Sequence, residues 1–262
     1  MSLVINTNVA SLNAQRSLAK SGAELSTAME RLSSGKKINS AADDAAGFAI
    51  AERMTAQVRG LNMATKNAND GLSMLATIEN ATNDVTDMLH RMRELAVQAA
   101  NDTNSATDRG YLQTEVTALI AEIDRVASDT KYNGTAVLDG TFTSKKLQVG
   151  TEAAQSITFS VSDVDATALA VNAADISTQA GAATALTSIS AAIETVAGQR
   201  ATYGALQNRL EYTVSNLMNV SEFTQAARSR IEDADFAAES ARLSKAQVLQ
   251  QTGTAMLAQA NA

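Results

Sequence analysis

The sequence of 262 residues contains no cysteine, no proline and no tryptophan, and aromatic residues make up only 3% of it. Without cysteine, disulfide bonds and thiolate chemistry are excluded. Chains of this length that fold around a compact globular core usually bury more large rings than this one contains. The apolar content comes instead from Ala, Leu, Val, Ile and Met, a composition that suits long helices touching along narrow seams.

Positive charge and long hydrophobic runs are also scarce. Lys and Arg number 21 against 28 Asp and Glu, and no basic block stands out, so nucleic acid is not an expected partner. No apolar run approaches the ~18 residues of a membrane span, and we expect no membrane insertion. The first residues lack the basic lead and apolar run of a secretory signal peptide, so a secreted product needs another export route.

Residues that carry enzyme chemistry are equally rare. His90 is the one histidine, and it lies beside two arginines in a helical pattern, where a solvated or interfacial side chain is the expected role. The HExxH, GxSxG, Walker and GxGxxG motifs are absent. We therefore predict that the chain is not an enzyme and has no catalytic residues, metal or cofactor.

A seven-residue apolar repeat between Met54 and Ala99 is the strongest positive signal. It predicts one helix of about fifty residues, roughly 75 Å long at ~1.5 Å per residue. Shorter repeats at 18–32 and 112–126 predict two more helices, the second antiparallel to the long one. The expected seam residues, from this helix and another long one near the C-terminus, are Met54, Leu61, Leu75, Leu89, Ile189, Val196, Leu210 and Leu217.

The remaining segments complete a mainly α fold, a long antiparallel helical bundle or coiled coil with a small β-hairpin. Alternation of apolar and polar residues at 147–149 and 157–161 predicts the hairpin. The Ala-, Ser-, Thr- and Asp-rich residues 163–183 are predicted to be an exposed connection. Helical spacing resumes at Leu186, and smaller residues continue the 3/4 spacing at Ile231, Ala234, Ala238 and Ala241.

A polar segment, RLSSGKKINSAADDAAGFAIAERM, separates the first apolar repeat from the long one. Gly after two serines fits a helix C-cap. Two adjacent aspartates point about 100° apart on a helix, so they fit the start of the next helix better than an acid–base pair. We predict a sharply bent joint at 33–46, and its key residues are Ser34, Gly35, Asn39, Asp43 and Asp44.

This polar segment closely resembles the N-terminal signature of bacterial flagellins, and the opening INTNVASLNAQRSL is similar to theirs. Further similar stretches are LHRMRELAVQAANDTNS, EIDRVASDTKYNG, NRLEYTVSNLMNVSEFTQAARSRIEDADFAAES and SKAQVLQQTGTAMLAQANA. Together they cover most of residues 3–138 and 195–262. Several long matches in the same order make the resemblance specific.

The resemblance implies a division of the chain into an inner and an outer layer of a flagellar filament. Residues 1–44 and 226–262 are expected to form the inner domain around the central channel, with the joint as its spoke. Residues 45–225 are expected to form an outer helical domain with a β element near 139–165. Because the middle of the chain is short, we expect a thin filament without large projections.

Partners and location are also implied by the resemblance. The chain is expected to polymerise with itself outside the cell as the propeller for swimming, after passing the flagellar type III export apparatus with a chaperone. Filament cap and hook-associated proteins are expected at the ends of the polymer. A Toll-like receptor of animal hosts is a further expected partner, contacted by Arg91, Leu95 and Glu115 on a face that is exposed in the monomer.

Three other interpretations remain open from the sequence. A flagellar hook–filament junction protein shares the terminal helices, although the RELAVQ and ARSRIEDADFA stretches favour the filament subunit. A flagellin with a zinc-protease insertion is disfavoured because HExxH is absent and the middle is short. A membrane-active coiled coil lacks the basic amphipathic face that such proteins use.

Overall fold

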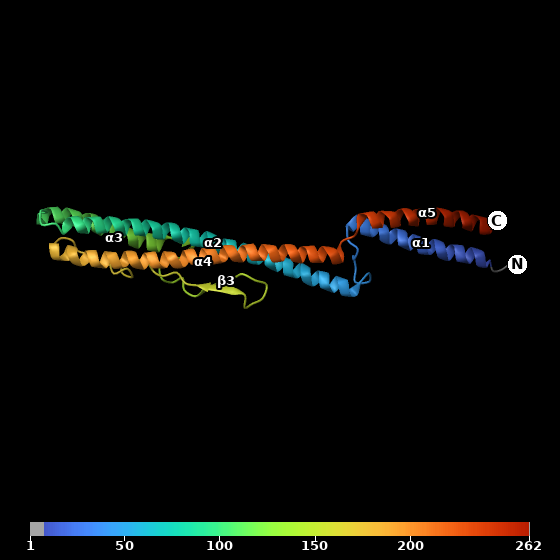
Figure 1. Cartoon of the computed structure of the whole chain (residues 1–262), viewed down its shortest axis with the longest axis horizontal. Coiled ribbons are helices and arrows are strands. Elements are labelled where there is room, and N and C mark those ends of the chain that lie inside the picture. The colour runs from blue at the N-terminus through green and yellow to red at the C-terminus, as the bar shows by residue number, and fades with distance from the viewer. Residues whose placement is uncertain (1–7, 262) are drawn as a thin grey trace. The chain divides into compact units, whose positions relative to one another are not determined.

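The computed structural model describes residues 8–261, which form five helices and two small sheets (Figure 1). The mainly α fold is therefore confirmed. The helices are α1 (Val9–Ser34), α2 (Ala45–Ala99), α3 (Ala106–Asp129), α4 (Gln179–Glu232) and α5 (Phe236–Asn261). The strands are β1 (Lys131–Tyr132), β2 (Thr135–Ala136), β3 (Lys145–Gln148) and β4 (Ser156–Phe159).

The described chain divides into two compact units. The terminal unit contains residues 8–59 and 221–261, and the central unit contains residues 60–220. Helix α2 starts in the terminal unit and ends in the central one, and α4 runs the other way along the chain. The 55 residues of α2 correspond to about 80 Å of helix, so the long helix predicted from the heptads is present.

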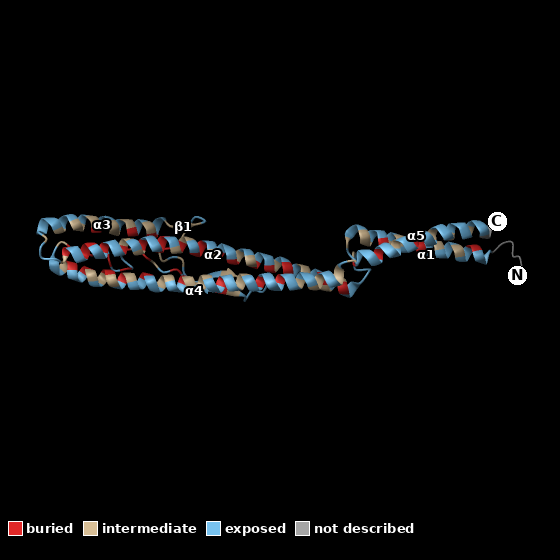
Figure 2. Ribbon diagram, turned by 45° about the horizontal axis from the view of Figure 1, so that its top comes forward, coloured by how far each residue is buried: buried red, intermediate tan, exposed pale blue. Residues whose placement is uncertain are grey.

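The core of the central unit is built from α2, α3 and α4. Buried positions recur along the facing sides of these helices, where Figure 2 shows them in red. Leu75 and Leu89 of α2 and Ile189 of α4 are completely inaccessible. Among the remaining predicted seam residues, those that are buried are Leu61, Val196, Leu210 and Leu217, while Met54 in the terminal unit is half-buried.

Two antiparallel hairpins interrupt the helices. The predicted hairpin is present as β3 and β4, with Leu147 opposite Ile157. The β1–β2 pair was not predicted, although its turn is formed by Asn133-Gly134, a dipeptide typical of tight hairpin turns. Both turn residues have positive φ, 48° and 78°, which is the backbone of a type I′ hairpin turn.

The expectation of an exposed connection at 163–183 is wrong. Val164, Val171 and Ile176 in this segment are completely buried in the central core. The segment has no helical or strand period, so its apolar residues gave no periodic signal. Side chains from the helices satisfy its backbone instead, and Gln113 of α3 accepts from Ile176 N–H at 2.6 Å and donates to Ala174 O at 3.2 Å.

The C-terminal helical signal is also corrected in two ways. Helix α4 begins at Gln179 rather than Leu186, and the helix does not continue through 231–241. It stops at Glu232, and α5 starts at Phe236 after a break at 233–235. The 3/4 spacing of small residues passes across the break because a short interruption preserves the approximate phase.

One described helix meets the length and composition criteria for a membrane span. An 18-residue window of α4 has a mean hydropathy of 1.2, and 28% of it is buried. Core helices of soluble proteins meet the same criteria, so the observation is weak evidence. The absence of membrane insertion stays a prediction.

Candidate functional site

The joint between α1 and α2 begins where Gly35 ends the first helix. Gly35 has φ 72° and ψ 6°, a left-handed conformation, and its N–H donates to Arg31 O at 2.9 Å. The Ser34 hydroxyl accepts from Lys36 N–H at 3.1 Å, which satisfies the next backbone donor. Together these contacts turn the chain sharply out of the helix.

The two aspartates of the joint have different roles. Asp43 Oδ2 accepts from the N–H groups of Asn39 and Ser40 at 3.1 and 2.9 Å and from the Ser40 hydroxyl at 3.1 Å. These hydrogen bonds, first those from the backbone, lower the pKa of the Asp43 carboxyl. Asp44 Oδ1 accepts from Ala46 and Gly47 N–H at 3.1 and 3.0 Å, so it alone caps α2.

Asn39 and Ile38 complete the loop. The Asn39 side chain donates to Lys36 O at 3.3 Å. Ile38 is only 3% exposed, and a Cβ added to Gly47 would lie 2.7 Å from its Cδ1. The glycine therefore allows the isoleucine to close over the first turn of α2.

The second half of the joint is the break between α4 and α5. Lys37 N–H donates to Glu232 O at 2.6 Å, and Ala234 N–H donates to Gly35 O at 2.9 Å, so the two interruptions pair as an antiparallel bridge. The Lys36 ammonium forms an ion pair with Glu232. The sequence did not predict that 233–235 pairs with the first interruption. The available signal was Asp235, which accepts from the N–H of 237 and 238 at 2.9 and 3.2 Å as the cap of α5.

A buried ion cluster adjoins the bridge. Glu239 in the first turn of α5 accepts from Arg31 at 2.9 Å and from Arg242 at 3.2 Å, and its side chain is only 6% exposed. Across the terminal unit, Arg228 donates to Thr55 Oγ1 at 3.2 Å. The four segments that meet at the joint are thus tied by both backbone and charged side-chain contacts.

The predicted receptor-contact residues are only partly together on the surface of the central unit. Arg91 Nε lies 2.7 Å from Glu115 Oε1, which raises the pKa of Arg91, and both side chains are about half exposed. Leu95 is 1% exposed and belongs to the bundle core. The expectation that Leu95 lies on an exposed face of the monomer is therefore wrong.

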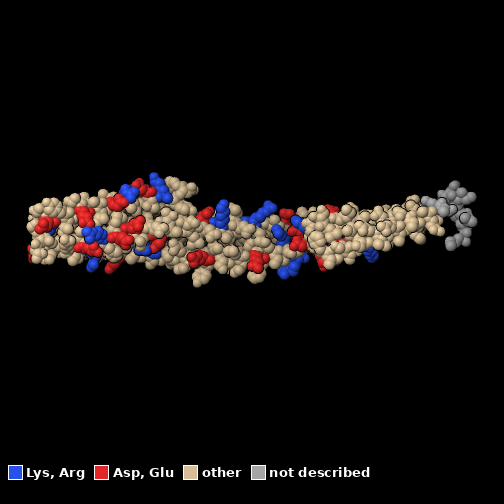
Figure 3. Space-filling model, turned by 90° about the horizontal axis from the view of Figure 1, so that it is seen from above, with Lys and Arg blue, Asp and Glu red and all other residues tan. Residues whose placement is uncertain are grey.

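The described residues contain no cluster of three or more His, Asp or Glu side chains that is placed to hold a metal ion. His90 is exposed. The face in Figure 3 carries acidic and basic groups intermixed over most of its length, without a large patch of one sign.

The terminal unit exposes several large apolar side chains. Phe223 is 72% exposed and Met256 is 66% exposed. The others in this unit are Val9, Leu12, Met29, Phe236, Val248 and Leu249.

Comparison with known proteins gives consistent matches at both ends of the chain. Residues 5–143 match the family model for the bacterial flagellin N-terminal helical region, and residues 186–262 match that for the C-terminal helical region. A flagellin of Halalkalibacterium halodurans is 43% identical over 261 residues, covering 99% of this chain and 96% of that protein.

Two solved structures are similar in fold. The crystal structure of Bacillus cereus flagellin is 33% identical with a TM-score of 0.53, covering 58% of this chain and 88% of that one. A chain described as a flagellar hook-associated protein from Vibrio parahaemolyticus has a TM-score of 0.63 at 16% identity, covering 73% of this chain and 100% of that one. The second similarity shows shared fold alone.

Proposed function

Because this chain belongs to the bacterial flagellin family and is a subunit of the flagellar filament, we propose that its polymer works as the propeller of a swimming cell. The observation that supports this most directly is the exposed apolar surface of the terminal unit, where Phe223 and Met256 have no cover in the single chain. Polymerisation supplies that cover by burying apolar area between copies.

We further propose the layered arrangement of the polymer. Residues 1–44 and 226–262 form the inner layer around the channel, and residues 45–225 form the outer layer. The observed units divide at 59/60 and 220/221, so α2 and α4 each contribute a terminal segment to the unit that contains α1 and α5. The joint is the spoke between the layers. The chain passes through it twice, at 33–46 and at 233–235, and the backbone bridge holds these two passages side by side.

Export and accessory partners belong to the same proposal. The chain passes the flagellar type III export apparatus with the help of a chaperone. Cap and hook-associated proteins lie at the two ends of the finished filament. A hook–filament junction role is not favoured, because the matches at both ends are to flagellin families and the hook-associated similarity is 16% identical.

A complementation experiment tests the function. A motile bacterium that lacks its own filament subunit is supplied with the full chain or with a chain lacking residues 226–262. The full chain is expected to restore filaments in electron micrographs and spreading in soft agar, whereas the shortened chain is expected to restore neither. Filaments without swimming would remove the propeller role, and swimming with the shortened chain would remove the inner-layer assignment.

A second proposal is recognition of the monomer by a Toll-like receptor, carried by the exposed Arg91–Glu115 pair. Leu95 then supports the helix from inside rather than contacting the receptor. The Arg91→Ala monomer is expected to signal more weakly than wild-type monomer in a receptor-reporter assay. Loss of an interface hot spot lowers the affinity roughly thirtyfold. Arg125→Ala on α3 is the matched control for an exposed, ion-paired arginine. Equal loss in both variants, or no loss in Arg91→Ala, would remove the site.

A further inference from the structure

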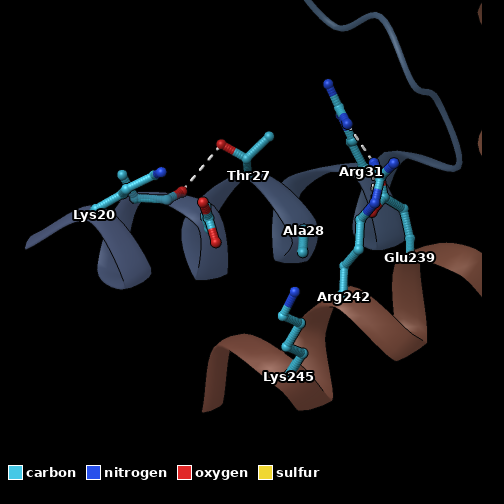
Figure 4. Close-up of a pocket in the computed structure, with 9 residues that line it drawn as sticks. Lys20, Thr27, Ala28, Arg31, Glu239, Arg242 and Lys245 are labelled. Carbon is cyan, nitrogen blue, oxygen red and sulfur yellow. Dashed lines mark hydrogen bonds and ion pairs between the residues drawn. The ribbon is translucent and has the colours of Figure 1, made fainter. Parts of the chain in front are cut away.

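A groove runs along one flank of the α1–α5 pair in the terminal unit. Its volume is about 520 Å³, and Ala28, 3% exposed, forms part of its lining (Figure 4). Figure 4 shows Lys245 extending from α5 toward α1. The charged and polar lining residues are Lys20, Glu24, Thr27, Arg31, Glu239, Arg242 and Lys245.

Cationic groups outnumber carboxylates in this groove. Four of its lining residues are Lys or Arg and two are Glu. Glu239 is already held by Arg31 and Arg242 at 2.9 and 3.2 Å. Neither Lys20 nor Lys245 forms an ion pair with any residue in the described part of the chain. A chain with a formal charge of −7 thus holds a local excess of positive charge here.

One buried donor belongs to an arginine that lines the groove. The Nε atom of Arg31 is buried and makes no hydrogen bond among the described residues. A buried charged donor without a partner is unfavourable, and native structures usually supply an acceptor for such a group. Because this atom is buried, the exposed ammonium groups of Lys20 and Lys245 are the donors that a carboxylate entering the groove can reach.

Exposed apolar side chains lie on the same two helices as the charged lining of the groove. Leu249 follows Lys245 by four residues, so these two side chains lie on the same helix face. Leu12 precedes Lys20 by eight residues, which places it about 80° away around the helix. Leu12 is 52% exposed and Leu249 is 43% exposed. The chemistry that fits is a carboxylate with apolar groups a turn or two away, as on one face of an amphipathic helix.

We propose that this groove binds a carboxylate side chain on a helix of a second copy of the chain. The filament brings copies together at high local density, and this acidic chain supplies such faces itself. On α4, for example, Glu222 is exposed one turn after Met218, which is 59% exposed. The proposal depends on the chain forming a polymer. It adds an ion pair between copies to the contacts made by buried apolar surface.

Carbodiimide cross-linking tests it directly, because the reagent joins an amine to a carboxylate in contact and forms an amide with loss of water. Filaments are assembled from equal amounts of unlabelled and ¹⁵N-labelled chains, treated, digested and analysed by mass spectrometry. We expect mixed-isotope cross-links from Lys20 or Lys245 to a carboxylate of another copy, absent from dilute monomer. Cross-links of these lysines confined to Glu24 or Glu239 of the same chain, or none at all, would overturn the proposal.

Paired variants give an independent reading. Lys20→Gln with Lys245→Gln is expected to raise the critical concentration for polymerisation roughly tenfold and to weaken its dependence on salt. Lys66→Gln with Lys146→Gln removes two exposed lysines outside the groove and is the matched control. Equal behaviour of the two double variants contradicts the proposal. Failure of wild-type chains to polymerise would instead contradict the filament function.

Discussion

Gly35 controls the end of α1 through backbone conformation alone. Its φ of 72° lies in the left-handed region, while an added Cβ would meet no atom within 4 Å. We expect Gly35→Val to cost roughly 1–2 kcal/mol or more and to impair polymerisation, and Gly35→Asn to cost less, because asparagine tolerates this conformation. Electron microscopy of the polymer and circular dichroism of the monomer measure the two effects.

Gly22 provides the matched control for Gly35. It lies inside α1, an added Cβ there also meets no atom within 4 Å, and its φ is not positive. We expect Gly22→Ala to stabilise α1 by roughly 0.5–1 kcal/mol. Wild-type filaments from Gly35→Val would show that the cap is dispensable.

Asp43 makes the joint sensitive to acid. Its hydrogen bonds from the Ser40 and Asn39 backbone lower its pKa in the folded chain below the ordinary value near 3.9. The stabilisation is therefore fully present above that value and is lost as the pH falls through the lower, folded pKa. Hydrogen exchange of the Ser40 amide is expected to quicken, beyond its intrinsic pH dependence, below about pH 4. In Asp43→Asn this additional step should vanish, and its persistence would assign it to another group.

Gln113 shows how one side chain can hold an irregular segment at the scale of an element. It is bonded to both Ile176 N and Ala174 O. Gln113→Ala is expected to lower the free energy of unfolding by roughly 1–3 kcal/mol, because two backbone groups beside the core lose their partner. Urea denaturation followed by circular dichroism measures this. Tyr111→Ala, at a side chain 71% exposed on the same helix, is expected to change it by less than about 0.5 kcal/mol.

Tyr203 holds the other end of the same segment. Its hydroxyl oxygen accepts from Ser162 N–H at 3.2 Å, and burial raises the pKa of the phenol. The Gln113→Ala prediction has a clear contrary outcome. If the Gln113→Ala and Tyr111→Ala variants unfold at the same urea concentration, the buried segment is held by its apolar contacts rather than by hydrogen bonds to its backbone.

At the scale of the element, the sequence predicts well those helices and core positions that follow a repeating apolar pattern. The heptads of α2 predict its length, and Leu75 and Leu89 fall in the core as expected. The buried segment containing Val164 and Val171 was missed because its partners are distant side chains that no local period encodes. The break at 233–235 was missed for the same reason, since its backbone partner lies at Gly35. The Arg91–Glu115 contact agrees with the antiparallel packing predicted for the two helices. The burial of Leu95 depends on which side of α2 faces the core, and this cannot be read from the spacing alone.

At the scale of the whole molecule, the two units differ in the size of the side chains that they bury. Buried apolar residues of the terminal unit are mostly small, as at Ala28, Ala51 and Ala246, whereas the central unit buries many large aliphatic side chains. We expect limited proteolysis of the monomer to trim both ends and leave a core near residues 45–225. In the polymer the same ends are expected to resist, because other copies cover them. Equal resistance of both ends in monomer and polymer would contradict this.

The pairing of the two interruptions has a consequence for the order of folding. Arg31 and Glu239 are 208 residues apart in sequence, so the joint closes a very long loop. Packing of Leu61 and Ala64 against Leu217 in the central unit shortens the open part of that loop to on the order of fifty residues, which lowers the entropy cost of closure. The central unit is thus expected to fold first. A chain that emerges N-terminus first cannot close its joint until nearly all of it has arrived, so a closed joint marks a complete subunit.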